Sequence, residues 1–280
     1  MHSELRQLLP TKLWNEPTTE LFCDAVNLIK YRTRDFFKVV ELETTTACNR
    51  ACSYCPNSVF ERGRIKNERR MSEATFQSII DQLAELSFWG RLSPHFYGEP
   101  LLDERLPDWM AYARAKLPYT KLVIFTNGDL LTPAVHDKLV NAGVDGFLVT
   151  QHGPKPPRNI VKLRRHREET SGLRARLDYR VFTSATELSN RAGLVDHTLL
   201  ETKSDCSLPS ENVTIDFQGN VVLCCNDYHS TVTFGNIRER HLGAIWREPR
   251  YRRIRRRLKQ GRFDLEICKK CASGQHGAGG

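Results

Sequence analysis

The chain has 280 residues, of which 40% are hydrophobic and 27% are charged, and its formal net charge is +9. This length and composition are typical of one catalytic domain with a smaller appendage, and they exclude a lone binding module and a disordered chain. The sequence has no apolar run of the roughly eighteen residues that a membrane span needs and no signal-peptide pattern at its start, so we expect a cytoplasmic protein without membrane contact.

Helices and strands are predicted to alternate from residue 18 to residue 182. Periodicity predicts a helix at 18–31, with Leu28 and Ile29 on its apolar side, and a strand at 37–42. Further strands are expected to end near residue 97 and to span 121–125, 146–150 and 175–182, with helices at 72–86, 107–116, 133–141 and 159–170. This alternation predicts an α/β fold with a parallel sheet, and about five strands are too few for a closed eightfold barrel. We therefore expect a partial, TIM-like (β/α) barrel.

The pattern changes after residue 190. Two short strands at 212–217 and 221–225 flank the turn Gln218-Gly219-Asn220, which is a hairpin signal, and a helix is expected at 242–259. We divide the chain into an N-terminal helical leader (1–36), a partial barrel (37–190) and a small C-terminal α+β domain (200–280).

Nine cysteines are many for a cytosolic chain, in which structural disulfides are rare. Cys48, Cys52 and Cys55 follow the first predicted strand, and three thiolates at this spacing can hold three irons of a [4Fe-4S] cluster while the fourth iron stays open. A structural zinc ion is the alternative, but such a site requires four closed ligands.

A second group of cysteines lies in the C-terminal region. Cys206, Cys224, Cys268 and Cys271 supply four thiolates, which suit either a complete [4Fe-4S] cluster or a zinc ion. Because successive residues of a strand point to opposite faces, we expect the spare Cys225 to face away from this group. Cys23, in the first helix, is expected to pack in the core.

The segment from Cys48 to Pro56 resembles the signature motif of the radical S-adenosylmethionine (SAM) superfamily, including the aromatic Tyr54 before the third cysteine. The resemblance implies that the open iron binds SAM and that Tyr54 lies against its adenine. It also implies that the segment Gly98-Glu99-Pro100 binds the SAM amino group and that the strand ends at Asn127, Thr150 and Gln151 face the ribose and the substrate. Tyr97, Gln151 and His152 depart from the usual family pattern.

The run from Gly219 to Tyr228, followed by the segments at 234–237 and 245–246, resembles the shortened SPASM, or twitch, domain that carries one auxiliary [4Fe-4S] cluster. Members with this size and cysteine layout include an epimerase and a dehydrogenase of aminoglycoside intermediates. We therefore expect a small aminoglycoside or aminocyclitol substrate in antibiotic biosynthesis.

Two chemistries are open for such a substrate. We favour epimerisation, with Cys225 as the hydrogen-atom donor; the alternative is dehydrogenation of a secondary alcohol to a ketone, with Arg180 or Asp227 as a base. Maturation of a ribosomal peptide is a third hypothesis, against which stands the short segment before the first strand.

Basic residues concentrate at 162–167 and 247–259. A solvated helical face explains each run, and without a recognition module we expect no nucleic-acid partner. A flavodoxin or ferredoxin is acidic, so an electron donor of that type is the partner that we expect at a basic patch.

Overall fold

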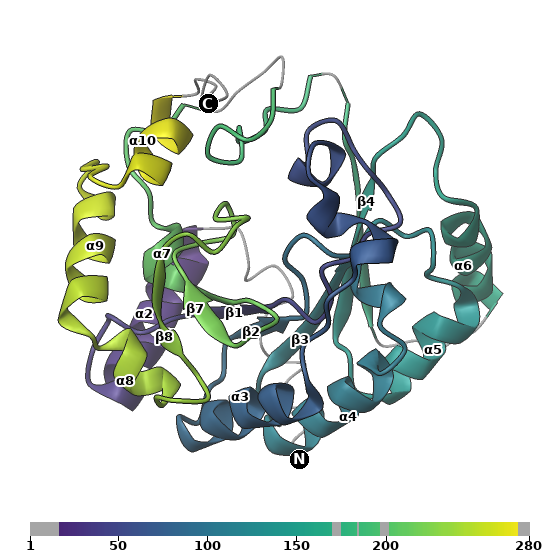
Figure 1. Ribbon diagram of the computed structural model, residues 1–280. Coiled ribbons are helices and arrows are strands. Elements are labelled where there is room, and N and C mark those ends of the chain that lie inside the picture. The colour runs from purple at the N-terminus through teal and green to yellow at the C-terminus, as the bar shows by residue number, and fades with distance from the viewer. Residues whose placement is uncertain (1–16, 170–174, 184, 197–201, 274–280) are drawn as a thin grey trace.

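The computed structural model describes residues 17–169, 175–183, 185–196 and 202–273, and within these residues eight strands form one sheet (Figure 1). The strands are β1 (Val39–Leu42), β2 (Arg91–Ser93), β3 (Lys121–Thr126), β4 (Gly146–Gln151), β5 (Arg176–Val181), β6 (Asn212–Ile215), β7 (Asn220–Val222) and β8 (Thr233–Asn236). Their order is β5-β4-β3-β2-β1-β6-β7-β8. Neighbouring strands from β5 through to β6 pair in parallel. β7 pairs antiparallel with β6, and β8 pairs antiparallel with β7.

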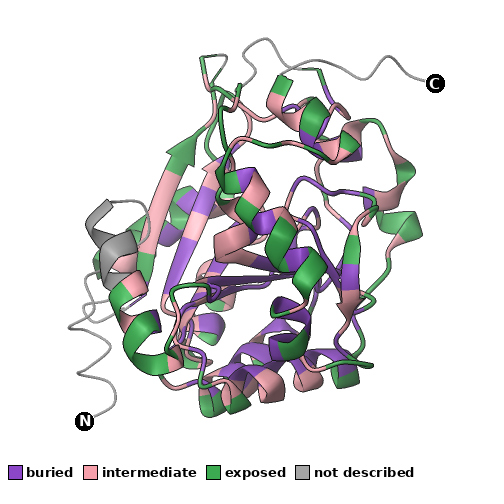
Figure 2. Cartoon of the chain, turned by 90° about the vertical axis from the view of Figure 1, so that its left-hand side faces the viewer, coloured by how far each residue is buried: buried purple, intermediate pink, exposed green. Residues whose placement is uncertain are grey.

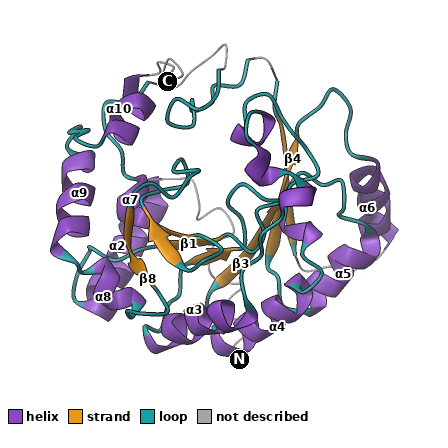
Figure 3. Cartoon of the chain, in the orientation of Figure 1, coloured by secondary structure: helices purple, strands orange, loops and turns teal. Residues whose placement is uncertain are grey.

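Helices surround the sheet, as Figure 3 shows. The helices of the barrel half are α2 (Pro17–Tyr31), α3 (Glu73–Glu85), α4 (Leu106–Lys116), α5 (Pro133–Asn141) and α6 (Arg158–Glu169). The helices of the C-terminal half are α7 (Leu208–Glu211), α8 (Leu242–Trp246), α9 (Pro249–Lys259) and α10 (Glu266–Ser273). Short 3-10 turns cover η1 (Pro56–Ser58), η2 (Glu61–Gly63), η3 (Ile65–Asn67) and η4 (Pro100–Leu102). No helix of the described residues is long and apolar enough to cross a membrane.

The two faces of the central strands differ in polarity. Val40, Leu42 and Leu92 are fully buried in the main hydrophobic core, together with residues of α3. Glu41 lies between Val40 and Leu42 on β1. Its register partners are Ser93 on β2 and Thr214 on β6. Because side chains alternate along a strand, these polar groups point to the inner face of the sheet. The buried strands lie inside the more exposed helices in Figure 2.

The expected α/β partial barrel is confirmed, with one addition. Five parallel strands were predicted for the barrel, but β6 pairs with β1 in parallel from Asn212 to Ile215 and is a sixth. The predicted hairpin is confirmed by β6 and β7, and Gly219 in its turn has a φ of +89°, a conformation that side chains other than glycine rarely adopt. The sheet is continuous across the proposed boundary near residue 200, so the domain limits stay a prediction.

Two predicted element boundaries were wrong. The strand expected to end near residue 97 stops at Ser93, because Pro94 follows and has no N–H to donate. The helix expected at 242–259 is interrupted at Arg247 and Glu248, since Pro249 starts a new helix that Glu248 caps.

The prediction for the buried side of the first helix, α2, was also wrong. Leu28 and Ile29 are exposed, whereas Asn27 is fully buried. The Asn27 amide donates to the Phe36 carbonyl and accepts from the Trp89 indole, which satisfies this polar group inside the protein. The side chain of Cys23 lies outside the described residues.

Candidate active site

Three free thiols lie in the loop that follows β1. Cys48, Cys52 and Cys55 are each partly buried, and a bond of 2.8 Å from the Cys55 N–H to the Cys52 carbonyl folds the loop into a tight turn. Burial raises the pKa of the Cys48 thiol to about 12. A bound metal can displace such a proton, so these thiols suit metal ligation rather than reactivity as free thiolates.

The cysteine loop is tied to the end of β3 by polar side chains. Arg50 donates two hydrogen bonds of 2.6 Å to the Asp129 carboxylate, one from Nε and one from Nη2. Asn49 accepts from the Asn127 amide at 2.8 Å and donates to Asp129 at 3.0 Å. The loop therefore has a fixed position relative to the end of β3.

The segment Gly98-Glu99-Pro100 packs against the start of the same loop. A Cβ at Gly98 would lie 2.0 Å from the Thr45 carbonyl oxygen, so only glycine fits there. The Glu99 carboxylate accepts from the Thr126 hydroxyl at 2.7 Å and from the Asn127 N–H at 2.9 Å. Burial raises the pKa of Glu99 to about 7, and a cationic ligand would favour its ionised form.

Tyr54 belongs to an aromatic group beside the loop. Its hydroxyl lies 2.5 Å from His152 Nδ1, and its ring is 5.7 Å from that of Phe182. Burial lowers the pKa of His152 to about 4, so this imidazole is neutral near pH 7. His152 thus has a structural contact with Tyr54.

The end of β4 carries two further predicted residues. Gln151 is buried; its amide nitrogen donates to the Gly153 carbonyl at 2.7 Å, and its amide oxygen accepts from the Tyr179 hydroxyl. Thr150 is partly buried beside it. The nitrogen and the oxygen of the Gln151 side-chain amide are therefore both engaged within the protein, which suits a positioning role.

The second set of cysteines meets around one small pocket. Cys206, Cys224, Cys268 and Cys271 all line it, together with apolar residues that include Leu258 and Phe263. Cys268 and Cys271 lie three residues apart on α10, a spacing that places both thiols on one helical face. Four thiols around one apolar pocket are a suitable ligand set for a [4Fe-4S] cluster.

Cys225 does not line this pocket, although the reason differs from the one predicted. β7 ends at Val222, so Cys224 and Cys225 lie in a turn and not on alternating positions of a strand. Burial, and next the nearby Glu41, raise the pKa of Cys225 to about 12, while Arg191 opposes the shift. Cys225 therefore stays a neutral thiol near Glu41 and Arg191.

Arg191 is a site residue that the sequence patterns did not indicate. It has a left-handed φ of 50°, its Nη1 donates to Asn226 at 3.2 Å, and its Nε is buried without a hydrogen-bond partner among the described residues. Its charge acts on Cys55 of the first loop and on Cys271 of the second group. Arg191 thus lies between the two cysteine sites.

Polar atoms without partners gather on the inner face of the barrel. Within the described part of the chain, Ser93 Oγ, His95 Nδ1 and the Tyr97 hydroxyl are buried and lack a hydrogen bond. Glu41 lies 4.0 Å from His95 and 3.7 Å from Arg91, and burial raises its pKa although Arg91 opposes the shift. Unpaired buried polar atoms are costly unless a ligand satisfies them, so this inner face suits a polyhydroxylated ligand.

The two bases considered from the sequence have different surroundings. Asp227 is buried, and its carboxylate accepts from the Thr231 hydroxyl and from the N–H groups of Thr231 and Val232. It stabilises its own turn, which makes it a poor base. Arg180 is exposed on the edge strand β5.

Comparison with known proteins identifies the family. Residues 42–177 match the Radical SAM superfamily, and residues 206–272 match the SPASM iron-sulfur cluster-binding domain. The chain is 35% identical to the S-adenosyl-L-methionine-dependent 2-deoxy-scyllo-inosamine dehydrogenase of Niallia circulans, over 84% of this chain and 92% of the relative. The chain belongs to the radical SAM superfamily.

The structural comparison agrees with the sequence match. The crystal structure of BtrN in complex with AdoMet and 2-DOIA superposes with a TM-score of 0.75 and 33% identity, covering 84% of this chain and 93% of BtrN. A PqqA peptide cyclase of Xanthomonas campestris is 36% identical over 107 residues, which is 38% of this chain but only 26% of the cyclase.

The cofactors of this radical SAM enzyme are SAM and two [4Fe-4S] clusters. The residues present fit them: the loop thiols would hold three irons, the Glu99 carboxylate is placed for an ammonium group, and the pocket thiols would hold a complete cluster. Among the described residues, no three His, Cys, Asp or Glu side chains are arranged to hold a single metal ion.

Proposed function

We propose that this radical SAM enzyme is a dehydrogenase that oxidises a secondary alcohol of an aminocyclitol to a ketone. The observation that carries the proposal is the 35% identity to a 2-deoxy-scyllo-inosamine dehydrogenase, 92% of whose length is matched. The sequence patterns favoured epimerisation, but the relatives support the dehydrogenase alternative better. Peptide maturation has weaker support, because only 26% of the peptide cyclase is matched.

The reaction sets three requirements on the chain. When bound, the cluster with the open iron and SAM would together supply the one-electron chemistry that removes a hydrogen atom from the carbinol carbon. The hydroxyl proton then needs a base, and the one remaining electron needs an acceptor. Formation of the C=O bond therefore releases one proton and returns one electron, which balances the electron taken up.

Polar groups on the inner face of the barrel support the binding of an amino alcohol there. The unpaired Ser93 hydroxyl and His95 Nδ1 can bond to ring hydroxyls, and the Tyr97 hydroxyl extends this set towards Arg191. Satisfying buried polar atoms gives selectivity for a ligand that carries matching hydroxyl groups.

Glu41 is our candidate for the base that accepts the hydroxyl proton. It is buried, its pKa is raised by loss of hydration, and it accepts a bond of 3.2 Å from Thr214. A carboxylate whose pKa is shifted towards the working pH is a suitable general base. Arg91 and His95 lie close enough to orient it.

Arg191 is the residue best placed to connect the two sites. Its positive charge lies near Cys55, near Cys225 and near Cys271 of the second group of cysteines. A cation in this position stabilises negative charge that develops on the substrate oxygen as the hydroxyl proton leaves. We propose Arg191 as a positioning and electrostatic residue rather than as the base.

The test uses anaerobically reconstituted protein with SAM, dithionite and 2-deoxy-scyllo-inosamine that carries deuterium on the carbinol carbon. We expect a ketone and monodeuterated 5'-deoxyadenosine in equal amounts. In Glu41→Gln, deuterium should still reach 5'-deoxyadenosine while ketone formation falls by about a hundredfold or more, the lower end of the range for a general base. An epimer with hydrogen from solvent would instead support the Cys225 route and contradict the proposal.

A further inference from the structure

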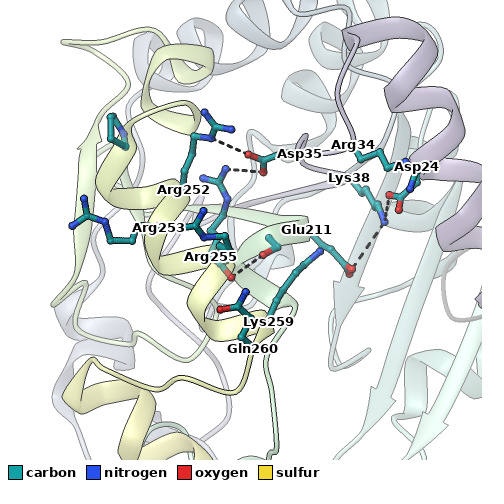
Figure 4. Close-up of a pocket in the computed structure, with 13 residues that line it drawn as sticks. Asp24, Arg34, Asp35, Lys38, Glu211, Arg252, Arg253, Arg255, Lys259 and Gln260 are labelled. Carbon is teal, nitrogen blue, oxygen red and sulfur yellow. Dashed lines mark hydrogen bonds and ion pairs between the residues drawn. The ribbon is translucent and has the colours of Figure 1, made fainter.

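A large groove lies on the outside of the C-terminal half, away from the inner face of the barrel. Its volume is about 830 Å³, and α9, α7 and the segment before β1 form its walls (Figure 4). Seven basic side chains and three acidic ones line it. The basic residues are Arg34, Lys38, Arg252, Arg253, Arg255, Arg256 and Lys259.

The acidic residues of the groove are already paired with bases. Asp35 accepts from Arg255 at 2.8 Å and from Arg252 at 3.2 Å, and Lys38 pairs with Asp24 at 3.0 Å. Arg255 is buried under these contacts, and its guanidinium lies 3.6 Å from the centre of the Trp246 ring. Its side chain therefore packs inside the wall that α9 forms.

The remaining basic residues are free to meet a partner. Arg253, Arg256 and Lys259 project from α9, are exposed, and form no ion pair with any described residue. They recur at spacings of three residues, so they lie on one side of the helix. Arg34, also exposed, adds a positive charge from the opposite wall. The groove therefore presents an excess of positive charge to solvent.

The same two helices separate this groove from the pocket of four thiols. On α7, Leu208 and Pro209 line the thiol pocket whereas Ser210 and Glu211 line the groove. On α9, Leu258 lines the thiol pocket whereas Lys259 lines the groove. The Leu258 carbonyl also accepts a hydrogen bond of 3.0 Å from the Cys206 N–H. A wall about one helix thick, on the order of 10 Å, thus lies between the groove and the cluster ligands.

We propose that this groove, defined by Arg34, Arg253, Arg256 and Lys259, is the docking site of an acidic one-electron carrier protein of the flavodoxin or ferredoxin type. The carrier exchanges its electron with the auxiliary cluster through the α7–α9 wall. This inference rests on the proposed dehydrogenation, which takes up one electron in SAM cleavage and returns one from the substrate. The carrier is oxidised in the first step and reduced in the second, so no further oxidant is needed.

The composition of the groove favours an acidic protein over a nucleic acid. Its basic residues are interleaved with Asp24, Asp35 and Glu211. The surface of an acidic protein carries some basic side chains that can face these carboxylates, whereas a phosphate backbone offers only negative charge. α9 has 11 residues and spans about 16 Å, a length that suits a small protein patch. Charge complementarity of this kind acts mainly on the association rate and depends strongly on salt.

The test compares two charge-reversed variants with the same change in net charge. Arg253→Glu/Arg256→Glu alters the groove, whereas Lys162→Glu/Arg165→Glu alters exposed residues of α6, which lies on the opposite side of the molecule from α9 (Figure 1). Binding of a recombinant bacterial flavodoxin to each anaerobically reconstituted protein is measured by titration at low and high salt. A milder pair, Arg253→Gln/Arg256→Gln, is included to keep disruption of α9 small.

We expect the groove variant to bind flavodoxin about tenfold more weakly than wild type, with a smaller salt dependence, and the α6 variant to bind like wild type. The Gln pair should give an intermediate loss. Turnover with dithionite, which needs no docking, should be the same in all four proteins. Equal affinity of the groove and α6 variants would overturn the inference, as would groove-dependent binding of a DNA duplex in place of flavodoxin. If the wild-type enzyme forms no ketone with dithionite, that result counts against the proposed function. The binding measurements with flavodoxin would still stand.

Discussion

The guanidinium of Arg50 and the carboxylate of Asp129 form a two-point ion pair that joins the cysteine loop to the end of β3, with both N–O distances at 2.6 Å. Residues 79 positions apart in the chain are thereby held together beside Cys48 and Cys52. The geometry of the cysteine loop depends on this contact as well as on its own turns.

Replacing Arg50 with Lys should loosen the loop, because an ammonium group cannot make both bonds of the planar guanidinium. We expect SAM affinity to fall about tenfold, which corresponds to a loss of about 1.4 kcal/mol. Equilibrium binding of SAM to the reconstituted protein measures this. Arg64→Lys is the matched control, since Arg64 pairs with exposed Glu61 at 3.6 Å, and SAM affinity should not change there.

SAM affinity should depend on the ionisation of Glu99. Burial raises the pKa of Glu99 above its ordinary value to about 7, so the carboxyl is mostly protonated at pH 6. It must then lose a proton before it can accept a bond from an ammonium group. Affinity is therefore expected to weaken as pH falls below 7, approaching about tenfold per pH unit. Binding measured at pH 6 and pH 8 tests this. In Glu99→Gln affinity should be lower and should not vary over this range, and an equal pH dependence in both proteins would contradict the role of Glu99.

The auxiliary site should be separable from the SAM site. Cys268→Ala removes one of the four thiols of the pocket, and we expect iron to fall from about eight to about four per chain. Cleavage of SAM under dithionite should persist, whereas ketone formation should be lost. Iron analysis and product analysis on one sample measure both effects. Cys225→Ala is the control and should keep about eight irons.

The same Cys225→Ala variant distinguishes the two chemistries. Burial keeps Cys225 protonated, so an S–H bond is present for hydrogen-atom donation if the enzyme uses one. For a dehydrogenase we expect ketone formation to change less than about threefold, and no epimeric alcohol with solvent deuterium at the inverted carbon in D2O. Loss of product in the variant, together with deuterium at the inverted carbon of an alcohol formed by the wild type, would show that epimerisation is the reaction.

Arg255 should matter for stability rather than for docking. It is buried, donates to the Trp246 carbonyl at 2.8 Å and pairs with Asp35. Arg255→Ala should lower the free energy of unfolding by about 3 kcal/mol, the lower end of the range for breaking a buried pair, since Asp35 is partly exposed. Chemical denaturation of the apo-protein measures this change. Arg253→Ala, on the exposed side of the same helix, should change it by less than about 0.5 kcal/mol.

The sequence allowed the barrel and both cysteine groups to be predicted because their signals are local. Short segments rich in apolar residues, alternating with helices, marked β3, β4 and β5, and the spacing of Cys48, Cys52 and Cys55 indicated one compact loop. The pairing of β6 with β1 could not be read in this way, since nothing in residues 212–215 specifies a partner more than 170 positions away.

The substrate side of the site was harder to predict for the same reason. Arg191 has an ordinary sequence context, and its position between Cys55 and Cys271 arises only when the chain folds. Glu41 is one charged residue in an apolar strand, a pattern that could have marked it as an inward-facing group had the register of β1 been known. The preference for epimerisation rested on a vicinal cysteine, which does not determine the fate of a substrate radical.

The most direct test of the central claim is a single anaerobic incubation of the reconstituted enzyme with SAM, dithionite and 2-deoxy-scyllo-inosamine, analysed by mass spectrometry for both products. We predict one ketone formed for each 5'-deoxyadenosine, with the ketone two mass units lighter than its alcohol. No 5'-deoxyadenosine, or a product with the mass of the starting alcohol and an inverted carbon, would contradict assignment as a radical SAM dehydrogenase.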